Sequence, residues 1–217
     1  MWARRATVSG MATPTDALDP WFGSLEPEAD LDRMLLDGAD LVGADGEGAR
    51  LVECLLRGCD LDGAILDHAH LIDTTLTECR AGTVRARSAT WRDVTVEGCR
   101  FGALEVFGSA WDRVTIRGGK IDYLNLRDAT VRELRLVDCT IGDLDLAGAT
   151  VRALRTEGCQ VRRLDVTRAQ LRDADLRGAE LRALDGTAGL RGATISPEQL
   201  YDLAGALADH LGVVVDR

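Results

Sequence analysis

Aromatic side chains are scarce in this sequence: Phe, Trp and Tyr make up 4% of its 217 residues, so the core must be aliphatic. No run approaches the ~18 consecutive apolar residues of a membrane-spanning helix, which argues against contact with a bilayer interior. Basic residues are outnumbered, 26 against 36 acidic ones, and the net charge of −10 argues against direct nucleic acid binding. A composition with 46% hydrophobic and 29% charged residues is that of a globular protein.

The excess negative charge lies in the first third of the chain. Residues 1–80 contain 6 basic and 16 acidic residues, whereas residues 81–217 contain 20 of each. The sequence after Arg4 and Arg5 lacks the apolar segment of a secretory signal, so we expect a cytoplasmic protein. Residues 1–28 show no periodicity and are predicted to form a partly irregular leader, with Trp21 and Phe22 folding back onto the first repeat.

An internal repeat governs most of the remaining sequence. Every fifth residue from 31 to 181 is Leu, Val, Ile, Phe or Trp, with four exceptions at Gly46, Ala81, Ala86 and Thr156. The residue two positions earlier is small or apolar. A period of five fits neither an amphipathic helix nor a plain strand.

A second, longer period is superimposed on the first, because every twentieth position carries a similar residue. It aligns Ala29 with Ala49 and Ala69 in one column, and Cys59 with Cys79 in another. Members of one column therefore lie above one another, and the chain must turn through four five-residue sides in each coil. The period indicates an all-β solenoid over 29–195, with about eight coils over 29–188 and a length of roughly 40 Å at strand spacing.

The middle of the solenoid departs from this regular pattern. Between residues 84 and 164 the early inward position alternates between bulky and small residues, as at Leu104 and Ser109. We therefore expect a distorted or widened cross-section there. Trp91 and Trp111 lie one long period apart and are predicted to stack in neighbouring coils.

The segment 196–217 is predicted to form a C-terminal cap. The period slips at 186; Ser196 and Gln199 then form a capping-box pattern around Pro197, which is typical of a helix start. We expect a helix, a short strand over Val213–Val215, and a homodimer contact through this module. The candidate dimer-interface residues are Leu200, Leu203, Leu207, Leu211, Val213, Val214 and Val215. A monomer with both elements folded onto the final coils is the alternative.

The segments A-D-L at 29–31 and 39–41, C-D-L at 59–61 and A-D-L-R-G-A-E-L at 174–181 resemble the pentapeptide-repeat family. The resemblance implies a right-handed quadrilateral β-helix that serves as a binding scaffold rather than an enzyme. The chain is similar to the fluoroquinolone-resistance branch of that family, which implies a dimer that engages DNA gyrase as a DNA mimic. A neutral C-terminal portion and the lack of a long loop depart from that branch, so a scaffold for an unidentified partner is the alternative.

The residues that could carry chemistry favour a structural interpretation. All six cysteines occupy the early inward position and line up along the axis, as expected for core packing rather than a tetrahedral zinc site. The three histidines form no catalytic pattern, and no glycine-rich phosphate loop precedes a helix. We therefore predict no catalytic residues, no metal, no cofactor and no enzyme activity.

One outward column is acidic and is the candidate partner-binding surface. It consists of Glu105, Asn125, Asp145, Asp165 and Asp185. Like charges stacked at strand spacing repel one another, so the column needs an explanation. Asp and Asn can hydrogen-bond the backbone in turns; alternatively, the column imitates the regular charges of DNA.

Overall fold

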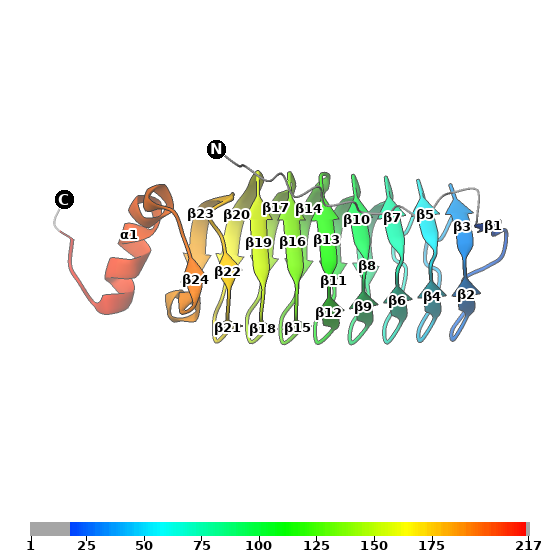
Figure 1. Cartoon of the computed structure of the whole chain (residues 1–217), viewed down its shortest axis with the longest axis horizontal. Helices are drawn as coiled ribbons and strands as arrows, with labels where there is room; N and C mark the ends of the chain where they lie inside the picture. Colours follow the sequence, from blue (N-terminus) through cyan, green and yellow to red (C-terminus); the bar gives the residue numbers. More distant parts are fainter. Residues whose placement is uncertain (1–17, 216–217) are drawn as a thin grey trace, which may run out of the picture.

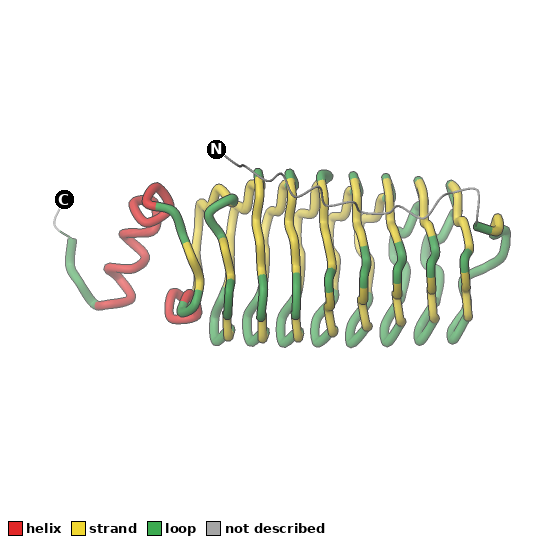
Figure 2. Tube along the Cα trace, viewed as in Figure 1, coloured by secondary structure: helices red, strands yellow, loops and turns green. Residues whose placement is uncertain are grey.

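The computed structural model describes residues 18–215 and shows a right-handed β-helix of about eight coils with a helix at its C-terminal end (Figure 1). Short strands lie on the sides of each coil and loops form the corners (Figure 2). Because each strand pairs with the equivalent strand of the next coil, the coils stack into parallel sheets and the rod has a continuous hydrogen-bonded wall. No helix in this described part of the chain is long and apolar enough to span a membrane.

Three sheets form the wall. Sheet 1 contains, in order, β1 (Asp19–Pro20), β3 (Met34–Asp37), β5 (Leu55–Arg57), β7 (Thr75–Thr77), β10 (Thr95–Glu97), β13 (Val114–Arg117), β16 (Leu134–Val137), β19 (Leu154–Glu157), β22 (Ala174–Asp175) and β24 (Ala193–Thr194). Sheet 2 contains β2 (Asp30–Asp32), β4 (Arg50–Val52), β6 (His70–Ile72), β9 (Thr90–Arg92), β12 (Ala110–Asp112), β15 (Thr130–Val131), β18 (Thr150–Val151) and β21 (Gln170–Leu171). Sheet 3 contains β8 (Arg80–Arg85), β11 (Arg100–Glu105), β14 (Lys120–Asn125), β17 (Thr140–Asp145), β20 (Cys159–Asp165) and β23 (Ala179–Asp185).

The cross-section changes along the rod. In the first coils the chain turns a corner at Gly43 and Gly63, both of which have a positive φ. The side of each coil that precedes this corner is joined to the next coil by isolated β-bridges, such as that between Asp40 and Asp60. From residue 80 onward the strands of sheet 3 run six or seven residues straight through the equivalent position. The residue after this corner changes from Ala64 to Val84 at the same point. The expected distortion therefore takes the form of a straightened corner, and bulkier side chains fill the wider interior.

The predicted column of core side chains is present. Trp91 and Trp111 are each 1% exposed, and their rings stack with centroids 5.1 Å apart and an interplanar angle of 19°. All six cysteines are buried free thiols at inward positions. Burial raises the pKa of the Cys54 thiol. The cysteines thus behave as small core residues.

Two ends of the β-helix differ from its middle. Asp19–Pro20 of the predicted leader add strand β1 to sheet 1, while Trp21 packs against the core and Phe22 is exposed. Residues 1–17 of the leader lie outside the described residues. At the other end, β24 pairs with β22 through Ala174 and Ala193, so the register falls one residue short of the long period. The short 3-10 helix η2 (Thr187–Leu190) contains this one-residue slip.

Helix α1 (Pro197–Leu211) follows. Ser196 is its N-cap and Gln199 completes the predicted capping box. The Gln199 side chain also donates to the carbonyl oxygens of Leu176 and Ala179, at 2.7 and 2.6 Å, so it covers unpaired groups of the last coils. The predicted strand over 213–215 is wrong. These residues follow the C-cap Gly212 on the far side of α1 from the coils, away from any sheet edge (Figure 1).

Candidate protein-binding surface

The five residues of the predicted acidic column form one continuous row on sheet 3. We call Glu105, Asn125, Asp145, Asp165 and Asp185 the acidic row; each is paired in register with the next. The strands β11, β14, β17, β20 and β23 position them, because each residue ends the straight segment of its coil. The long period of the sequence thus places five acidic or amide side chains at successive strand spacings.

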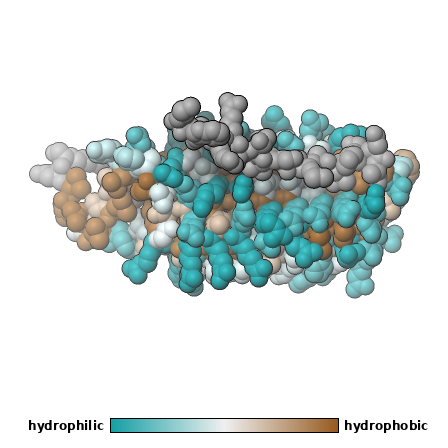
Figure 3. All heavy atoms as spheres, in the orientation of Figure 1, coloured by the Kyte–Doolittle hydropathy of each residue, from teal (hydrophilic) through white to brown (hydrophobic). Residues whose placement is uncertain are grey.

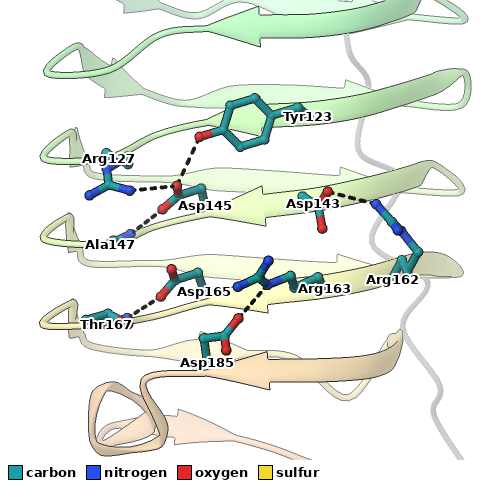
Figure 4. A network of polar contacts seen from close by, with 10 residues as sticks. All are labelled: Tyr123, Arg127, Asp143, Asp145, Ala147, Arg162, Arg163, Asp165, Thr167 and Asp185. Carbon is teal, nitrogen blue, oxygen red and sulfur yellow. Dashed lines mark hydrogen bonds and ion pairs between the residues drawn. The ribbon is translucent and has the colours of Figure 1, made fainter.

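Three members of the acidic row hold the following turn. A side-chain oxygen of Asn125 accepts from the Arg127 N–H at 3.2 Å. Asp145 accepts in the same way from the Ala147 N–H at 3.0 Å, and Asp165 from the Thr167 N–H at 2.8 Å (Figure 4). Each bond spans two residues and replaces a backbone partner at a corner, which is the known role of Asp and Asn in turns. These bonds support the turn explanation of the row.

Asp145 is the most enclosed member, with 7% of the residue exposed. Its second carboxylate oxygen accepts from the Tyr123 hydroxyl at 3.1 Å and from the Arg127 guanidinium at 3.4 Å (Figure 4). Tyr123 lies one coil before Asp145, and burial and the Asp145 charge raise its pKa to about 12. The tyrosine therefore stays a hydrogen-bond donor at neutral pH, and little of the Asp145 charge faces solvent.

Arginines also neutralise the charge near the end of the row. Arg163 donates to Asp185, and Arg162 donates to the adjacent Asp143 at 2.8 Å (Figure 4). Burial opposes ionisation of Asp165, but hydrogen bonds from the Thr167 hydroxyl and N–H outweigh it and lower the pKa of Asp165. The surface is consequently a row of acidic and amide side chains with arginines between them, rather than a uniform anionic stripe.

Tyr123, Arg127 and Arg163 belong to this surface but were missed in the sequence. Tyr123 and Arg163 each lie two residues before a member of the acidic row, and Arg127 lies two residues after one. Reading the columns on either side of the acidic one would have identified them as neighbours. The direction in which their long side chains reach has no sequence signal. Together with Asp143, Asp145 and Asp165 they line a shallow hollow of about 250 Å³.

The C-terminal candidates fall into two groups. Leu203 is 2% exposed and Leu207 is partly buried, and both pack against the core of the β-helix. Leu200 and Leu211 remain 50% and 75% exposed. The other exposed apolar residues of this module are Tyr201, Val213, Val214 and Val215. Apolar surface consequently gathers at this end of the rod (Figure 3).

Within residues 18–215, no group of three His, Cys, Asp or Glu side chains is arranged to hold a metal ion. His68 and His70 are exposed and lie apart from the acidic row, on the loop before β6 and on its first residue. The polar side chains that the structure brings together lie on the outer wall of the β-helix.

Comparison with known proteins identifies the repeats in the first half of the chain. Family models for a pentapeptide repeat region and for pentapeptide repeats match residues 49–126 and 27–63. No curated protein matches the sequence. Among solved structures, full-length QnrB1, a plasmid-mediated fluoroquinolone resistance protein, is 17% identical, with 85% of this chain and 90% of that chain covered and a TM-score of 0.35.

A second similar structure is HetL from the cyanobacterium Nostoc sp. strain PCC 7120, a pentapeptide repeat protein involved in heterocyst differentiation regulation. It is 18% identical, with 80% of this chain and 92% of that chain covered and a TM-score of 0.25. The repeats at 27–126, the regular register and the stacked coils lead to one conclusion: residues 27–126 of this chain are a pentapeptide-repeat region within a β-helix.

Proposed function

We propose that the protein is a non-catalytic interaction protein that binds a macromolecular partner through the outer wall of its β-helix, and that DNA gyrase is the partner to test first. The observation that carries the proposal is the filled interior. Bulky inward side chains such as Leu36, Leu124 and Leu134 are fully buried from the first coils to the sixth. Recognition must therefore use the side chains of the wall, which repeat at strand spacing.

The acidic row supports the gyrase proposal through its spacing. Four carboxylates and one amide stand in register on one face, and the first third of the chain adds a net charge of −10. A DNA-binding groove presents cations at regular intervals to phosphates, and a rigid row of carboxylates could occupy it. Such binding would protect or inhibit the enzyme and would make the protein a resistance factor against topoisomerase poisons. It also requires a cytoplasmic location.

A scaffold for a different protein is the second candidate. The arginines Arg127 and Arg163 favour it, because they interrupt the negative charge of the row. Mixed charges of this kind suit a protein surface of complementary pattern better than a polycationic groove.

A gyrase assay separates the two candidates. We expect purified protein at micromolar concentration to inhibit supercoiling or to reduce drug-poisoned cleavage, and the variant Glu105→Lys/Asp185→Lys to lose at least about tenfold in potency. These two positions are chosen because Asp145 and Asp165 also hold turns, so that reversing them would damage the fold.

The matched control is Asp32→Lys/Glu53→Lys, which changes the net charge equally at two exposed positions in the first coils. Wild-type protein without effect on supercoiling or cleavage contradicts the gyrase proposal. Equal loss in both variants would assign the effect to total charge and not to the acidic row.

We further propose a homodimer through the C-terminal module. The support is the exposed apolar group formed by Leu200, Tyr201, Leu211 and residues 213–215, since contiguous apolar surface of this kind marks interfaces. A two-fold contact would cover this surface in both copies.

A further inference from the structure

The outer surface of sheet 1 carries two rows of side chains that run along the rod, and the residue order of each row is compatible with its own reverse. The first row consists of Leu35, Leu55, Thr75, Thr95, Thr115, Arg135, Arg155 and Asp175. The second row lies two residues further on and consists of Asp37, Arg57, Thr77, Glu97, Arg117, Val137, Glu157 and Arg177. All members of both rows are at least partly exposed.

The second row is complementary to itself when its direction is reversed. Reversal places β3 against β22, β5 against β19, β7 against β16, and β10 against β13. The residues brought face to face are then Asp37 with Arg177, Arg57 with Glu157, Thr77 with Val137, and Glu97 with Arg117. Every charged residue meets the opposite charge.

We propose that a second copy of this chain docks antiparallel on the outer surface of sheet 1, about a two-fold axis between β10 and β13. The two-fold axis makes the contact isologous, so each of the three opposite-charge pairs occurs twice. The strand spacing is the same in both copies, which keeps all pairs in step along the rod.

The charges also select one register. Sliding the second copy by one coil in one direction places Asp37 against Glu157 and Glu97 against its own copy. Sliding it by one coil in the other direction places Arg57 against Arg177, and Arg117 against its own copy. Either slip replaces attraction by repulsion, which is how charge patterns exclude wrong pairings.

The first row allows the same contact. Reversal pairs Leu35 with Asp175, Leu55 with Arg155, Thr75 with Arg135, and Thr95 with Thr115. No like charges meet, and the residues nearest the two-fold axis are uncharged threonines. The aliphatic stem of Arg155 can cover Leu55, as arginine stems do on apolar surface.

The central pair is the most available for a partner. Glu97 and Arg117 are exposed, and neither makes an ion pair within residues 18–215. The outer pairs already have partners in their own chain: Arg57 donates to Asp37 at 2.6 and 2.8 Å, and Arg177 donates to Asp175. Reversal brings Glu157 to that Arg57 and Asp37 to that Arg177, so the existing pairs become larger clusters.

The contact consists mainly of solvent-exposed charges, so it must be weak and sensitive to salt. This distinguishes it from the apolar contact proposed for the C-terminal module, which salt does not screen. The quantity to follow is therefore the rise in average molecular mass of the full-length protein when salt is lowered from about 0.5 M to about 0.02 M. For the wild type we expect that rise, with association at least about tenfold tighter at the lower salt.

Two single variants and their mixture test the proposed pairing directly. Glu97→Arg alone and Arg117→Glu alone place like charges across the two-fold axis. Neither variant should therefore show the rise in average molecular mass at low salt. An equimolar mixture should regain it, because one variant carries arginine at both central positions and the other carries glutamate at both. A contact between residues 97 and 117 within one chain cannot give this result, because in each chain of the mixture these two residues still carry charges of the same sign.

The matched controls are Asp32→Arg at the end of β2 and Arg152→Glu directly after β18, two exposed positions beside sheet 2, which should keep the wild-type rise. Circular dichroism confirms that all variants fold. Three results would overturn the proposal. They are no rise in average mass for the wild type at low salt, a rise retained in both single variants on sheet 1, or a mixture whose average mass at low salt stays equal to that of the separate variants.

Discussion

Gly119 occupies an inward position at which the neighbouring coils place Cys99 and Cys139. Its backbone has a φ of 73°, and the preceding Gly118 has a φ of 60°. A Cβ atom at Gly119 would lie 2.2 Å from the carbonyl oxygen of Cys99. Both the positive φ and the close approach of backbone therefore require glycine at this corner.

The variant Gly119→Cys restores the column of cysteines and should nevertheless destabilise the protein. We expect a loss of about 1–3 kcal/mol in the free energy of unfolding, because a side chain would have to move the backbone or adopt a strained φ. Denaturant unfolding measures the loss. Cys139→Ala is the comparison and should cost roughly 1 kcal/mol as a small cavity. A Gly119→Cys protein as stable as the wild type would contradict the argument.

Residue positions were predictable where the period alone determines them. The inward direction of Cys99 and the stacking of Trp91 on Trp111 follow from the short and the long period of the sequence. The φ at Gly119 and the bonds from Tyr123 and Arg127 to Asp145 do not follow. The former depends on local backbone torsion and the latter on the rotamers of long side chains, and neither recurs from coil to coil.

At the scale of strands and coils, the change of cross-section was predictable in its location but not in its shape. The replacement of Ala64 by Val84 indicated where the interior widens. That the widening straightens one corner into the six-residue strand β8 depends on how the backbone of one coil pairs with the next. The predicted strand over 213–215 failed for a related reason, since valine-rich sequence forms a strand only beside a free sheet edge.

Asp67 links two successive coils. One carboxylate oxygen accepts from the Arg87 N–H at 2.8 Å, and the other accepts from the side chains of Arg85 and Arg87 at 3.1–3.2 Å. Burial alone would raise the pKa of Asp67, but the Arg87 N–H and the two guanidinium groups outweigh it and lower the pKa. The ionised carboxylate therefore stabilises the folded protein.

The lowered pKa gives a stability contribution with a definite pH dependence. The contribution is complete above the unfolded value of about 3.9 and is lost as pH falls through the lower folded value. We expect Asp67→Asn to cost about 1–2 kcal/mol at pH 7, a limited loss because the arginines are partly solvated. The difference from the wild type should shrink between about pH 4 and pH 2.

Denaturant unfolding across this pH range measures both effects. Asp32→Asn serves as the control, because Asp32 is exposed and makes no ion pair within residues 18–215. A constant difference between Asp67→Asn and the wild type down to pH 2 would show that the charge of Asp67 does not stabilise the coil contact.

At the scale of the whole molecule, the two ends of the rod are finished differently. Strand β1 and Trp21 extend and cover the first coils, whereas η2, Gln199 and α1 close the last ones. A solenoid needs such caps because its terminal coils expose unpaired backbone and apolar core. Leu203 and Leu207 suffice for this closure, which leaves the opposite side of α1 and residues 213–215 exposed.

A homodimer should cover this remaining apolar surface. We expect light scattering at tens of micromolar protein and about 0.5 M salt to give twice the chain mass of 23.4 kDa, because high salt screens charge contacts and leaves apolar ones intact. Leu211→Glu and Val214→Glu should each return the mass to that of one chain. These positions are 75% and 92% exposed, so their substitution spares the cap, whereas Leu207→Glu would also disturb packing on the coils.

Val42→Glu is the matched control for this dimer, since Val42 is an apolar residue 57% exposed in the first coils, at the opposite end of the rod from α1. It should leave the mass unchanged. A wild-type mass of one chain refutes the C-terminal dimer, and a dimer that survives both Leu211→Glu and Val214→Glu places the contact elsewhere on the rod. Because the proposed pairing on sheet 1 is salt-sensitive, a dimer that persists at high salt and is lost in these two variants assigns the apolar contact to the C-terminal module alone.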